Sequence, residues 1–308
     1  MPLICTVGDL VADIIVRLNS DPQRGTDTPA KIEFKRGGSA ANVAVAVAAA
    51  GGHARFIGQI GDDFVATMLA EELSSHGVDL RIVRSGTTGT IVVLVDDTGE
   101  RSFLTDRAAV LQLANVPATD LDDVDWLHVP AYSLTTGILA ETVQDLIGDA
   151  VERQIPISLS TSSVSVLSEY GRERFLDLVN AIQPEVVIAN RAEANYLLQG
   201  HPWFRHAKAT VVTAENRPAR FVRPDGSETR VSPEPVEVMD STGAGDAFTG
   251  AFLVAYASGA SPEPCLQAGH DMARRTLEHP GAGLGEINGL SSGTRTRPSP
   301  HEADAQLR

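Results

Sequence analysis

Short apolar runs of a length typical of β-strands recur along the first hundred residues, separated by glycine and polar turns. Leu3–Val7 and Ile14–Leu18 are two such runs, and the second is followed by a polar stretch that contains proline and glycine. Thr90–Asp96 and Arg101–Thr105 flank the sequence Asp-Asp-Thr-Gly-Glu, a pattern that predicts a β-hairpin. The stretches 14–36 and 88–106 could therefore form a small antiparallel sheet that projects from the main body.

Residues 37–52 are small and apolar almost throughout. Their alternation of valine and alanine resembles a strand, but the alanine content, the length and the closing Gly51-Gly52 favour a buried helix with a glycine C-terminus. Arg55–Ile60 then predicts a strand, and Asp63–His76 an amphipathic helix.

From about residue 120 onward, predicted strands and helices alternate. Such alternation favours a largely parallel sheet with helices on both faces, so the fold class is α/β. The expected strands are Trp126–Val129, Ile155–Leu159, Val186–Ala189 and Thr210–Thr213, with a hairpin of Arg220–Val222 and Glu228–Val231. The expected helices are Gly137–Arg153, Arg172–Ile182, Ala192–Leu198, Asp246–Ala257 and Pro264–Leu277.

The composition excludes a wholly disordered chain. Of 308 residues, 43% are hydrophobic, which is enough for a substantial core. The tail after Gly283 is rich in Gly, Ser, Thr and Pro and has little apolar content, so we expect residues 284–308 to be disordered.

The negative net charge limits the kinds of partner that the protein can bind. There are 25 Lys+Arg against 40 Asp+Glu, a net charge of −15, which argues against binding to nucleic acid or to a membrane surface. No lysine follows a glycine, so a lysine-containing P-loop is excluded. The two cysteines, Cys5 and Cys265, and the absence of a signal peptide or a long apolar span predict a cytoplasmic protein.

The segment Val238–Tyr256 carries the strongest chemical signal. Asp240 is followed by Ser241-Thr242-Gly243-Ala244-Gly245-Asp246 and then by the expected helix. Backbone N–H groups at such a helix N-terminus can bind a phosphate without lysine, and glycines allow close approach. Asp246, in the first turn, could accept a proton from an attacking hydroxyl. The alternative is that Asp246 only caps its own helix.

Four motifs in order resemble those of the ribokinase (PfkB) family of carbohydrate kinases, over about residues 3–283. They are Gly8 with Asp13; Gly37-Gly38-Ser39-Ala40-Ala41-Asn42; Asn190-Arg191-Ala192-Glu193; and Asp240–Asp246 with Phe248 and Gly250. The resemblance implies a ribokinase-like α/β fold, with a Rossmann-like, mostly parallel central sheet flanked by helices. It also implies one kinase domain at residues 1–283, with a small β-sheet lid inserted at about 14–36 and 88–106.

The resemblance also implies roles for individual residues. Asp246 would be the catalytic base, and the amides of Gly243, Ala244 and Gly245 would stabilise the transferring phosphoryl group. The residues implied in binding sugar hydroxyls are Asp13, Gly38 and Asn42. Arg107, after the second hairpin strand, could reach a substrate oxygen or could be a solvated charge of the lid.

The remaining implied contacts concern the nucleotide and metal ions. Asn190 and Glu193 would position Mg²⁺ and the ATP phosphates, Glu193 through water, and Thr213 would lie near the nucleotide. His270 would contact the adenine. Asp240, Thr242 and the Gly281 backbone lie where many members hold a monovalent cation, K⁺ or Na⁺.

Each implied role has a structural alternative. Asn42 could be a buried amide that only satisfies the backbone, and Asp13 could cap a turn. Asn190 and Glu193 have the spacing of a helix capping box. His270 could equally be a histidine packed in the core.

Two positions depart from the family pattern. After Thr213 the family usually has two glycines in a turn close to the nucleotide, and here Glu215 and Pro218 replace them. The turn must therefore differ, and Glu215 would add negative charge near the phosphates. Ser160 stands where many relatives have Asp or Asn.

The sequence thus predicts an enzyme that phosphorylates a sugar hydroxyl with ATP and Mg²⁺. One alternative is a nucleoside kinase of the same family, which would need an apolar or aromatic pocket. Another is a regulatory protein that binds sugar or nucleotide without catalysis. The exposed edge of the lid could pair with a second subunit to form a homodimer.

Overall fold

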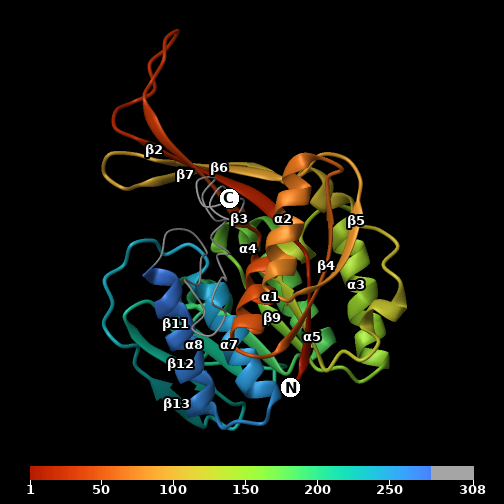
Figure 1. The fold of residues 1–308 in the computed structure, drawn as a ribbon. Coiled ribbons are helices and arrows are strands. Elements are labelled where there is room, and N and C mark those ends of the chain that lie inside the picture. Colours follow the sequence, from red (N-terminus) through yellow and green to blue (C-terminus); the bar gives the residue numbers. More distant parts are fainter. Residues whose placement is uncertain (279–308) are drawn as a thin grey trace, which may run out of the picture.

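Nine strands form the larger of two sheets in the computed structural model, which describes residues 1–278 (Figure 1). Their order is β13-β12-β11-β10-β9-β8-β1-β4-β5, and the seven strands from β11 to β5 are parallel. The strands are β1 Leu3–Val7, β4 His53–Ile60, β5 Asp79–Arg84, β8 Trp126–Pro130, β9 Ile157–Ser160, β10 Val186–Asn190, β11 Thr210–Ala214, β12 Arg217–Val222 and β13 Glu228–Val231.

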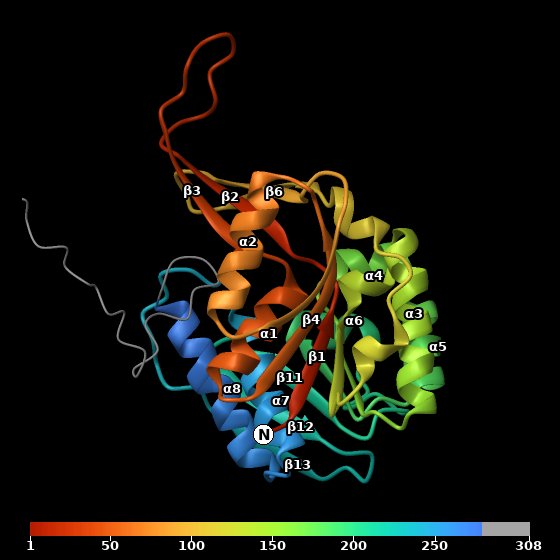
Figure 2. The same ribbon diagram turned by 45° about the vertical axis from the view of Figure 1, so that its right-hand side comes forward.

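Helices cover both faces of this sheet, as Figure 2 shows from the side. The α1, α2, α7 and α8 helices lie on one face and α3, α4, α5 and α6 on the other, each group over its own apolar core. The helices are α1 Ser39–Ala49, α2 Phe64–Ser75, α3 Gly137–Glu152, α4 Val164–Tyr170, α5 Arg172–Ile182, α6 Arg191–Leu198, α7 Ala244–Ala257 and α8 Pro262–Leu277. Short 3₁₀ turns are η1 Ala108–Gln112, η2 Ala118–Leu121 and η3 Ala131–Leu134. No helix within residues 1–278 has the length and apolar character needed to cross a membrane.

The α/β class and the mostly parallel central sheet are confirmed. The pattern did not indicate the strands β3 and β5 or the short helix α4. The predicted disordered tail at 284–308 lies outside the described residues.

A separate sheet of four strands projects above the main body, in the order β3-β2-β6-β7. These strands are β2 Val11–Leu18, β3 Ala30–Gly37, β6 Thr90–Val95 and β7 Arg101–Asp106. The expectation of an antiparallel sheet is wrong for one pairing, because β2 and β6 run parallel. They come from distant segments that both leave the main body in the same direction, so no hairpin joins them.

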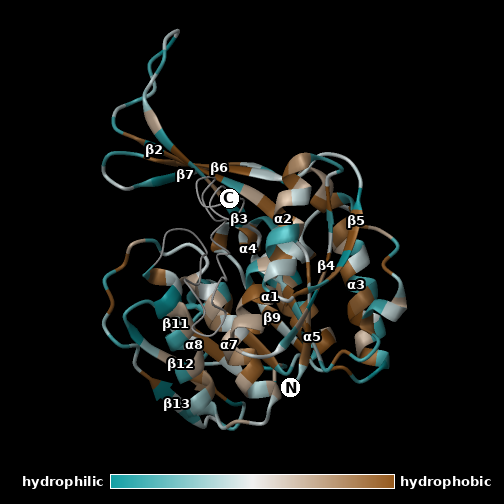
Figure 3. Cartoon of the chain, in the orientation of Figure 1, coloured by the Kyte–Doolittle hydropathy of each residue, from teal (hydrophilic) through white to brown (hydrophobic). Residues whose placement is uncertain are grey.

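The two faces of the small sheet are both apolar in part. On the face that we call the inner face, Asp13, Ile91 and Thr105 form one cross-strand row, followed by a row with Val93 and Phe103. The alternate positions form the outer face, which consists of Ile14, Val16, Ile32, Phe34, Val92, Leu94 and Leu104. Figure 3 shows apolar residues along the strands of the small sheet.

The order of the parallel strands reverses beside β1. The chain runs from β1 outward to β4 and β5, and then returns to β8 on the other side of β1. In open α/β sheets, ligands bind outside the carboxyl ends of the strands at such a switch point. The fold therefore predicts a site above β1 and β8, beneath the small sheet.

Helices α1 and α7 cross at a glycine. A Cβ atom added to Gly250 would lie 2.5 Å from Ala46 Cβ and 2.9 Å from the carbonyl oxygen of Val43. The two backbones can therefore approach closely only because position 250 has no side chain. This crossing holds the first turn of α7, with Asp246, against the first turn of α1, with Asn42.

Candidate active site

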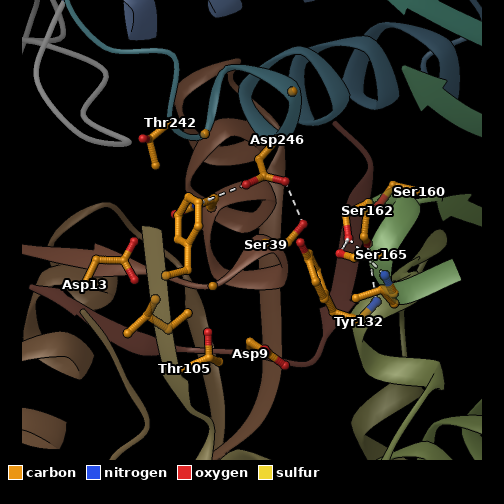
Figure 4. A pocket seen from close by; sticks show the side chains of 18 of the residues that line it. Asp9, Asp13, Ser39, Thr105, Tyr132, Ser160, Ser162, Ser165, Thr242 and Asp246 are labelled. Atoms are coloured by element: carbon orange, nitrogen blue, oxygen red, sulfur yellow. Dashed lines mark hydrogen bonds between the residues drawn. The ribbon is translucent and has the colours of Figure 1, made fainter. Parts of the chain in front are cut away.

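A cavity of about 860 Å³ lies between the inner face of the small sheet and the carboxyl ends of the parallel strands (Figure 4). Most of the residues singled out in the sequence line it, although they come from separate parts of the chain. They are Asp13, Gly38, Asn42, Arg107, Asn190, Glu193, Thr213, Asp240, Thr242, Gly243, Gly245 and Asp246. Ala244 lies between Gly243 and Gly245 at the start of α7.

Asp246 is held by two donors from α1. Ser39 Oγ donates to its Oδ1 at 2.6 Å, and Asn42 Nδ2 donates to its Oδ2 at 2.9 Å. Burial raises the pKa of the Asp246 carboxyl, and the Ser39 and Asn42 hydrogen bonds and the charge of Arg36 oppose that rise. Both contacts are made to α1, so Asp246 does more than cap its own helix, α7.

The loop before Asp246 has the geometry of an anion cradle. Gly243 adopts a left-handed conformation with φ of 76°, and the first hydrogen bond of α7 runs from Ala247 N to Gly243 O at 2.8 Å. The N–H groups at the start of a helix have no acceptor within the helix. A Cβ added to Gly245 would meet no atom within 4 Å, so an anion has room beside this backbone. The loop therefore fits a phosphate group.

Asp13 points into the cavity from β2 and is partly desolvated. Its buried Oδ1 has no hydrogen-bond partner within residues 1–278, and burial raises its pKa to about 6, against the opposing charge of Arg36. The backbone makes room for it, because a Cβ at Gly37 would lie 2.2 Å from that oxygen. Such a carboxylate is suited to accept a hydrogen bond from a ligand.

Replacing Asp13 with asparagine is expected to raise the free energy of unfolding at neutral pH but not in acid. The carboxyl titrates near 3.8 when exposed and near 6 when folded, so ionisation between these values weakens the folded state. The gain should grow from near zero at about pH 4 to about 2–3 kcal/mol at about pH 7.5. Urea unfolding of parent and variant at both pH values measures it, and equal stabilities at the higher pH would contradict the raised pKa.

Arg107 is an ion-pair partner within the site. Its Nε donates to Asp9 Oδ2 at 2.9 Å, and its Nη2 donates to Asp9 Oδ1 at 2.5 Å and to the carbonyl oxygen of Tyr132 at 3.1 Å. Both side chains line the cavity, and the Arg107 side chain is 14% exposed. Arg107 is thus a fixed charge that links the small sheet to the ends of β1 and β8, and not a solvated lid residue.

A second arginine of the small sheet reaches the loop before α7. Arg101 Nη2 donates to Asp240 Oδ1 and its Nη1 to Thr242 Oγ1, both at 2.8 Å. The N–H and hydroxyl of Thr242 donate to the same Asp240 oxygen, at 2.9 Å and 2.8 Å. In this structure a guanidinium therefore lies beside the carboxylate expected at a monovalent cation. The third residue of that expected site, Gly281, lies outside the described residues.

Asn190 and Glu193 form the capping box that was the structural alternative for them. Asn190 Oδ1 accepts from Glu193 N at 3.0 Å, and Glu193 Oε2 accepts from Asn190 N at 2.9 Å. Glu193 Oε1 accepts from Asn190 Nδ2 at 2.6 Å, and the Thr161 hydroxyl also donates to the carboxylate. Both residues still line the cavity. Within residues 1–278 no three His, Cys, Asp or Glu residues converge to hold a metal ion.

Two residues expected near the nucleotide do not line the cavity. His270 Nε2 lies 3.0 Å from the carbonyl oxygen of Val231, and its ring packs against Phe248, as the core alternative predicts. Glu215 is exposed, with φ of 48°, in the two-residue turn between β11 and β12. Its charge therefore does not face the cavity, whereas Thr213 does.

Several polar and aromatic residues of the cavity wall had no role assigned to them from the sequence. Ser39 belongs to a quoted motif but had no role assigned to it, and Asp9 directly follows the motif residue Gly8. Tyr132 follows β8 at a strand end, the kind of position from which a sheet presents ligand-binding residues. Arg101 and Phe103 belong to the predicted hairpin, but only their register on the inner face shows that they point inward.

A family model described as pfkB family carbohydrate kinase matches residues 1–288. The chain is 27% identical over 274 residues to a ribokinase from Bacillus subtilis, covering 86% of this chain and 89% of the relative. An adenosine kinase from Sinorhizobium meliloti superposes with a TM-score of 0.82 at 24% identity, covering 92% of this chain and 96% of that one. An Escherichia coli structure described as a ribokinase II with ATP and Mg²⁺ superposes at 0.79 and 21% identity, covering 92% and 94%. These two structures share the fold.

Proposed function

The chain belongs to the pfkB family of carbohydrate kinases, and we propose that it transfers the γ-phosphoryl group of ATP to a sugar hydroxyl, with Asp246 as general base. One observation carries the proposal. The carboxylate of Asp246 lies between the anion cradle of Gly243 to Gly245 and the hydrogen-bonding groups Asn42 and Asp13. A hydroxyl bound by Asp13 and a phosphate bound by the cradle would meet at Asp246.

In the proposed reaction, Asp246 accepts the proton of the substrate hydroxyl as its oxygen attacks the γ-phosphorus. The bond to the bridging oxygen of ADP breaks, and ADP leaves with the electron pair. The amides at the start of α7 donate to the phosphoryl oxygens as charge spreads over them. Mg²⁺ bound with ATP would neutralise part of the phosphate charge.

The small sheet would exclude water from this reaction. Arg101 and Arg107 connect it to the main body on two sides of the cavity, through the loop before α7 and through Asp9. With water excluded, Asp246 would activate the sugar hydroxyl and not water, which would otherwise hydrolyse ATP.

A nucleoside is the second candidate substrate because two aromatic side chains line the cavity. Phe103 lies on the inner face of the small sheet and is 62% exposed, and Tyr132 projects from the main body. A flat base between two such rings would bury apolar area and stack. The superposed Sinorhizobium meliloti protein is described as an adenosine kinase, which supports this alternative.

Release of ADP, measured with a panel of pentoses, hexoses and nucleosides, tests the proposal and separates the two classes. Turnover with a sugar and not with a nucleoside supports the first class. Turnover with nucleosides only, lost in Phe103→Ser while ATP binding stays, supports the second. Calorimetry that detects sugar binding without any turnover would overturn the kinase assignment in favour of a regulatory protein.

We also propose that two copies assemble through the outer face of the small sheet. Ile32, Phe34 and Leu104 are between 57% and 60% exposed there, next to further apolar neighbours on β2 and β6. Contiguous apolar surface of this kind marks interfaces, and a sheet face supplies more of it than the strand edge that the sequence suggested.

Phe34→Asp is expected to convert a dimer into a monomer, because it places a charge on the outer face beside Ile14 and Ile32. Light scattering after size exclusion gives the mass. Phe64→Asp is the matched control, since Phe64 is 77% exposed on α2 but lies outside the outer face, and it should leave the mass unchanged. A parent that is monomeric at the highest soluble concentration would overturn the assembly.

A further inference from the structure

We propose that Arg36, buried behind the cavity, is a positioning residue for phosphoryl transfer: it fixes the orientation of the Asn42 amide, which in turn holds Asp246. The inference rests on the proposed function of Asp246 as base. It assigns a role to a residue outside the motifs and outside the cavity wall.

Arg36 is the penultimate residue of β3, and its side chain is 4% exposed. Its Nε donates to Glu72 Oε1 on α2 at 3.1 Å, and its Nη1 donates to Asn42 Oδ1 on α1. Asn42 Nδ2 then donates to Asp246 Oδ2 on α7 at 2.9 Å. A continuous chain of hydrogen bonds thus runs from the half-exposed Glu72 through two buried side chains to the proposed base.

The guanidinium decides which way the Asn42 amide faces. Arginine has five N–H donors and no acceptor, so the atom of Asn42 that it contacts must be the oxygen. The NH₂ group of Asn42 is therefore directed at Asp246 and donates to its carboxylate. Without Arg36 the amide could rotate by half a turn and present its oxygen to the carboxylate, which would repel the ionised base.

Arg36 is also a positive charge that acts on two buried carboxylates. The charged and titratable groups that face Asp246 are Asp13 on β2, Arg36 on β3, Tyr132 on η3 and Glu193 on α6. On the loop before α7, Asp240 is paired with Arg101. Among these facing groups Arg36 lowers the pKa of both Asp13 and Asp246, whereas Glu193 raises that of Asp246.

Substrate contact does not explain Arg36, because it is absent from the residues that line the cavity. If Arg36 contributed only to stability, its guanidinium would not need to contact Asn42. Glu72 alone would neutralise the guanidinium, yet the second nitrogen is directed to Asn42, one of the two side chains that bond the base.

Arg36→Met and Arg36→Lys test the role against a matched control. Arg36→Met should lower kcat by about 10–100-fold, leave KM for ATP within about threefold, and move the acid limb of the kcat profile up by about one pH unit. Arg36→Lys keeps the positive charge but loses the planar set of guanidinium donors. Its acid limb should therefore match that of the parent, and its kcat should fall less than in Arg36→Met. Arg55→Met is the control, since Arg55 is 11% exposed, bonds Asp79 and two carbonyls, and is not among the residues that line the cavity. It should lower the melting temperature and leave the pH profile unchanged.

A second set of measurements adds variants of Glu72 and a readout that does not depend on turnover. Glu72→Ala removes the anchor of the guanidinium and should lower kcat several-fold, whereas Glu72→Gln keeps an acceptor for Nε and should recover most of it. Carbon-13 NMR of the Asp246 carboxyl, assigned by its loss in Asp246→Asn, should show a raised pKa in Arg36→Met, because that variant loses a positive charge near the carboxyl. If the parent lacks kinase activity, the proposed function fails by itself. If the parent is active and these variants keep its kcat, acid limb and Asp246 pKa, the role of Arg36 is overturned.

Discussion

The Asp246→Asn variant is expected to lose about three or more orders of magnitude in kcat, because proton transfer by a positioned base contributes up to about 10⁴-fold. The amide is nearly the same size as the carboxylate but cannot accept the hydroxyl proton at neutral pH. Its KM values should change little, since the cradle of backbone amides and the donors Asn42 and Ser39 remain. A coupled assay of ADP release measures both parameters.

The variant should fold, which makes its activity interpretable. The new side-chain oxygen can accept from Asn42 Nδ2, and the new NH₂ group can donate to the hydroxyl of Ser39, which rotates to accept. Burial raises the pKa of the Asp246 carboxyl, so a neutral amide should be at least as stable there. Asp145→Asn, on the exposed face of α3, controls for the exchange itself. Parent-like kcat in Asp246→Asn would remove Asp246 as the base.

The second large effect is expected at the crossing of α1 and α7. Gly250→Ala should lower the free energy of unfolding by about 2–4 kcal/mol, since overpacking typically costs about 1–3 kcal/mol and here the clash includes backbone. The added carbon would lie 2.9 Å from both Val43 O and Val47 N, atoms that cannot rotate away. Because the helices must separate, Asp246 should also move away from Asn42, and kcat should fall together with stability.

Gly148 provides the matched control for this substitution. It also lies inside a helix, α3, but an added Cβ would meet nothing within 4 Å. Gly148→Ala should therefore stabilise the protein by about 0.5–1 kcal/mol through helix propensity alone. Chemical unfolding of the two variants separates packing from propensity. A Gly250→Ala protein as stable as Gly148→Ala would show that the crossing tolerates a methyl group.

The central architecture could be predicted because buried parallel strands and the helices between them have strong apolar patterns. The helix Arg172–Ile182 and the strand Glu228–Val231 have the bounds that the pattern predicts. The strand β3 was missed, although Ile32 and Phe34 alternate with charged residues as in a strand, because the run is short and follows a stretch rich in proline and glycine.

The motif residues of the cavity could likewise be predicted, whereas the contacts among them could not. Asp246 and Asn42 are 204 positions apart, and Arg101 and Asp240 are 139 apart. Only the crossing of α1 with α7 and the closure of the small sheet bring these pairs together. His270 shows the converse, because its position in the sequence suggested a ligand contact but its ring packs inside the core.

In the small sheet, substitutions that face the cavity and substitutions that face outward fall on alternate residues of the same strands. On β2, β6 and β7, odd-numbered residues such as Asp13, Val93 and Phe103 face the cavity, and even-numbered ones such as Ile14, Val92 and Leu104 face outward. A single substitution can thus alter the shape presented to the substrate without altering the outer surface, or the reverse. Relatives could diverge in substrate and in assembly independently along the same strands, while the loop before α7, on a distant part of the chain, stays constant.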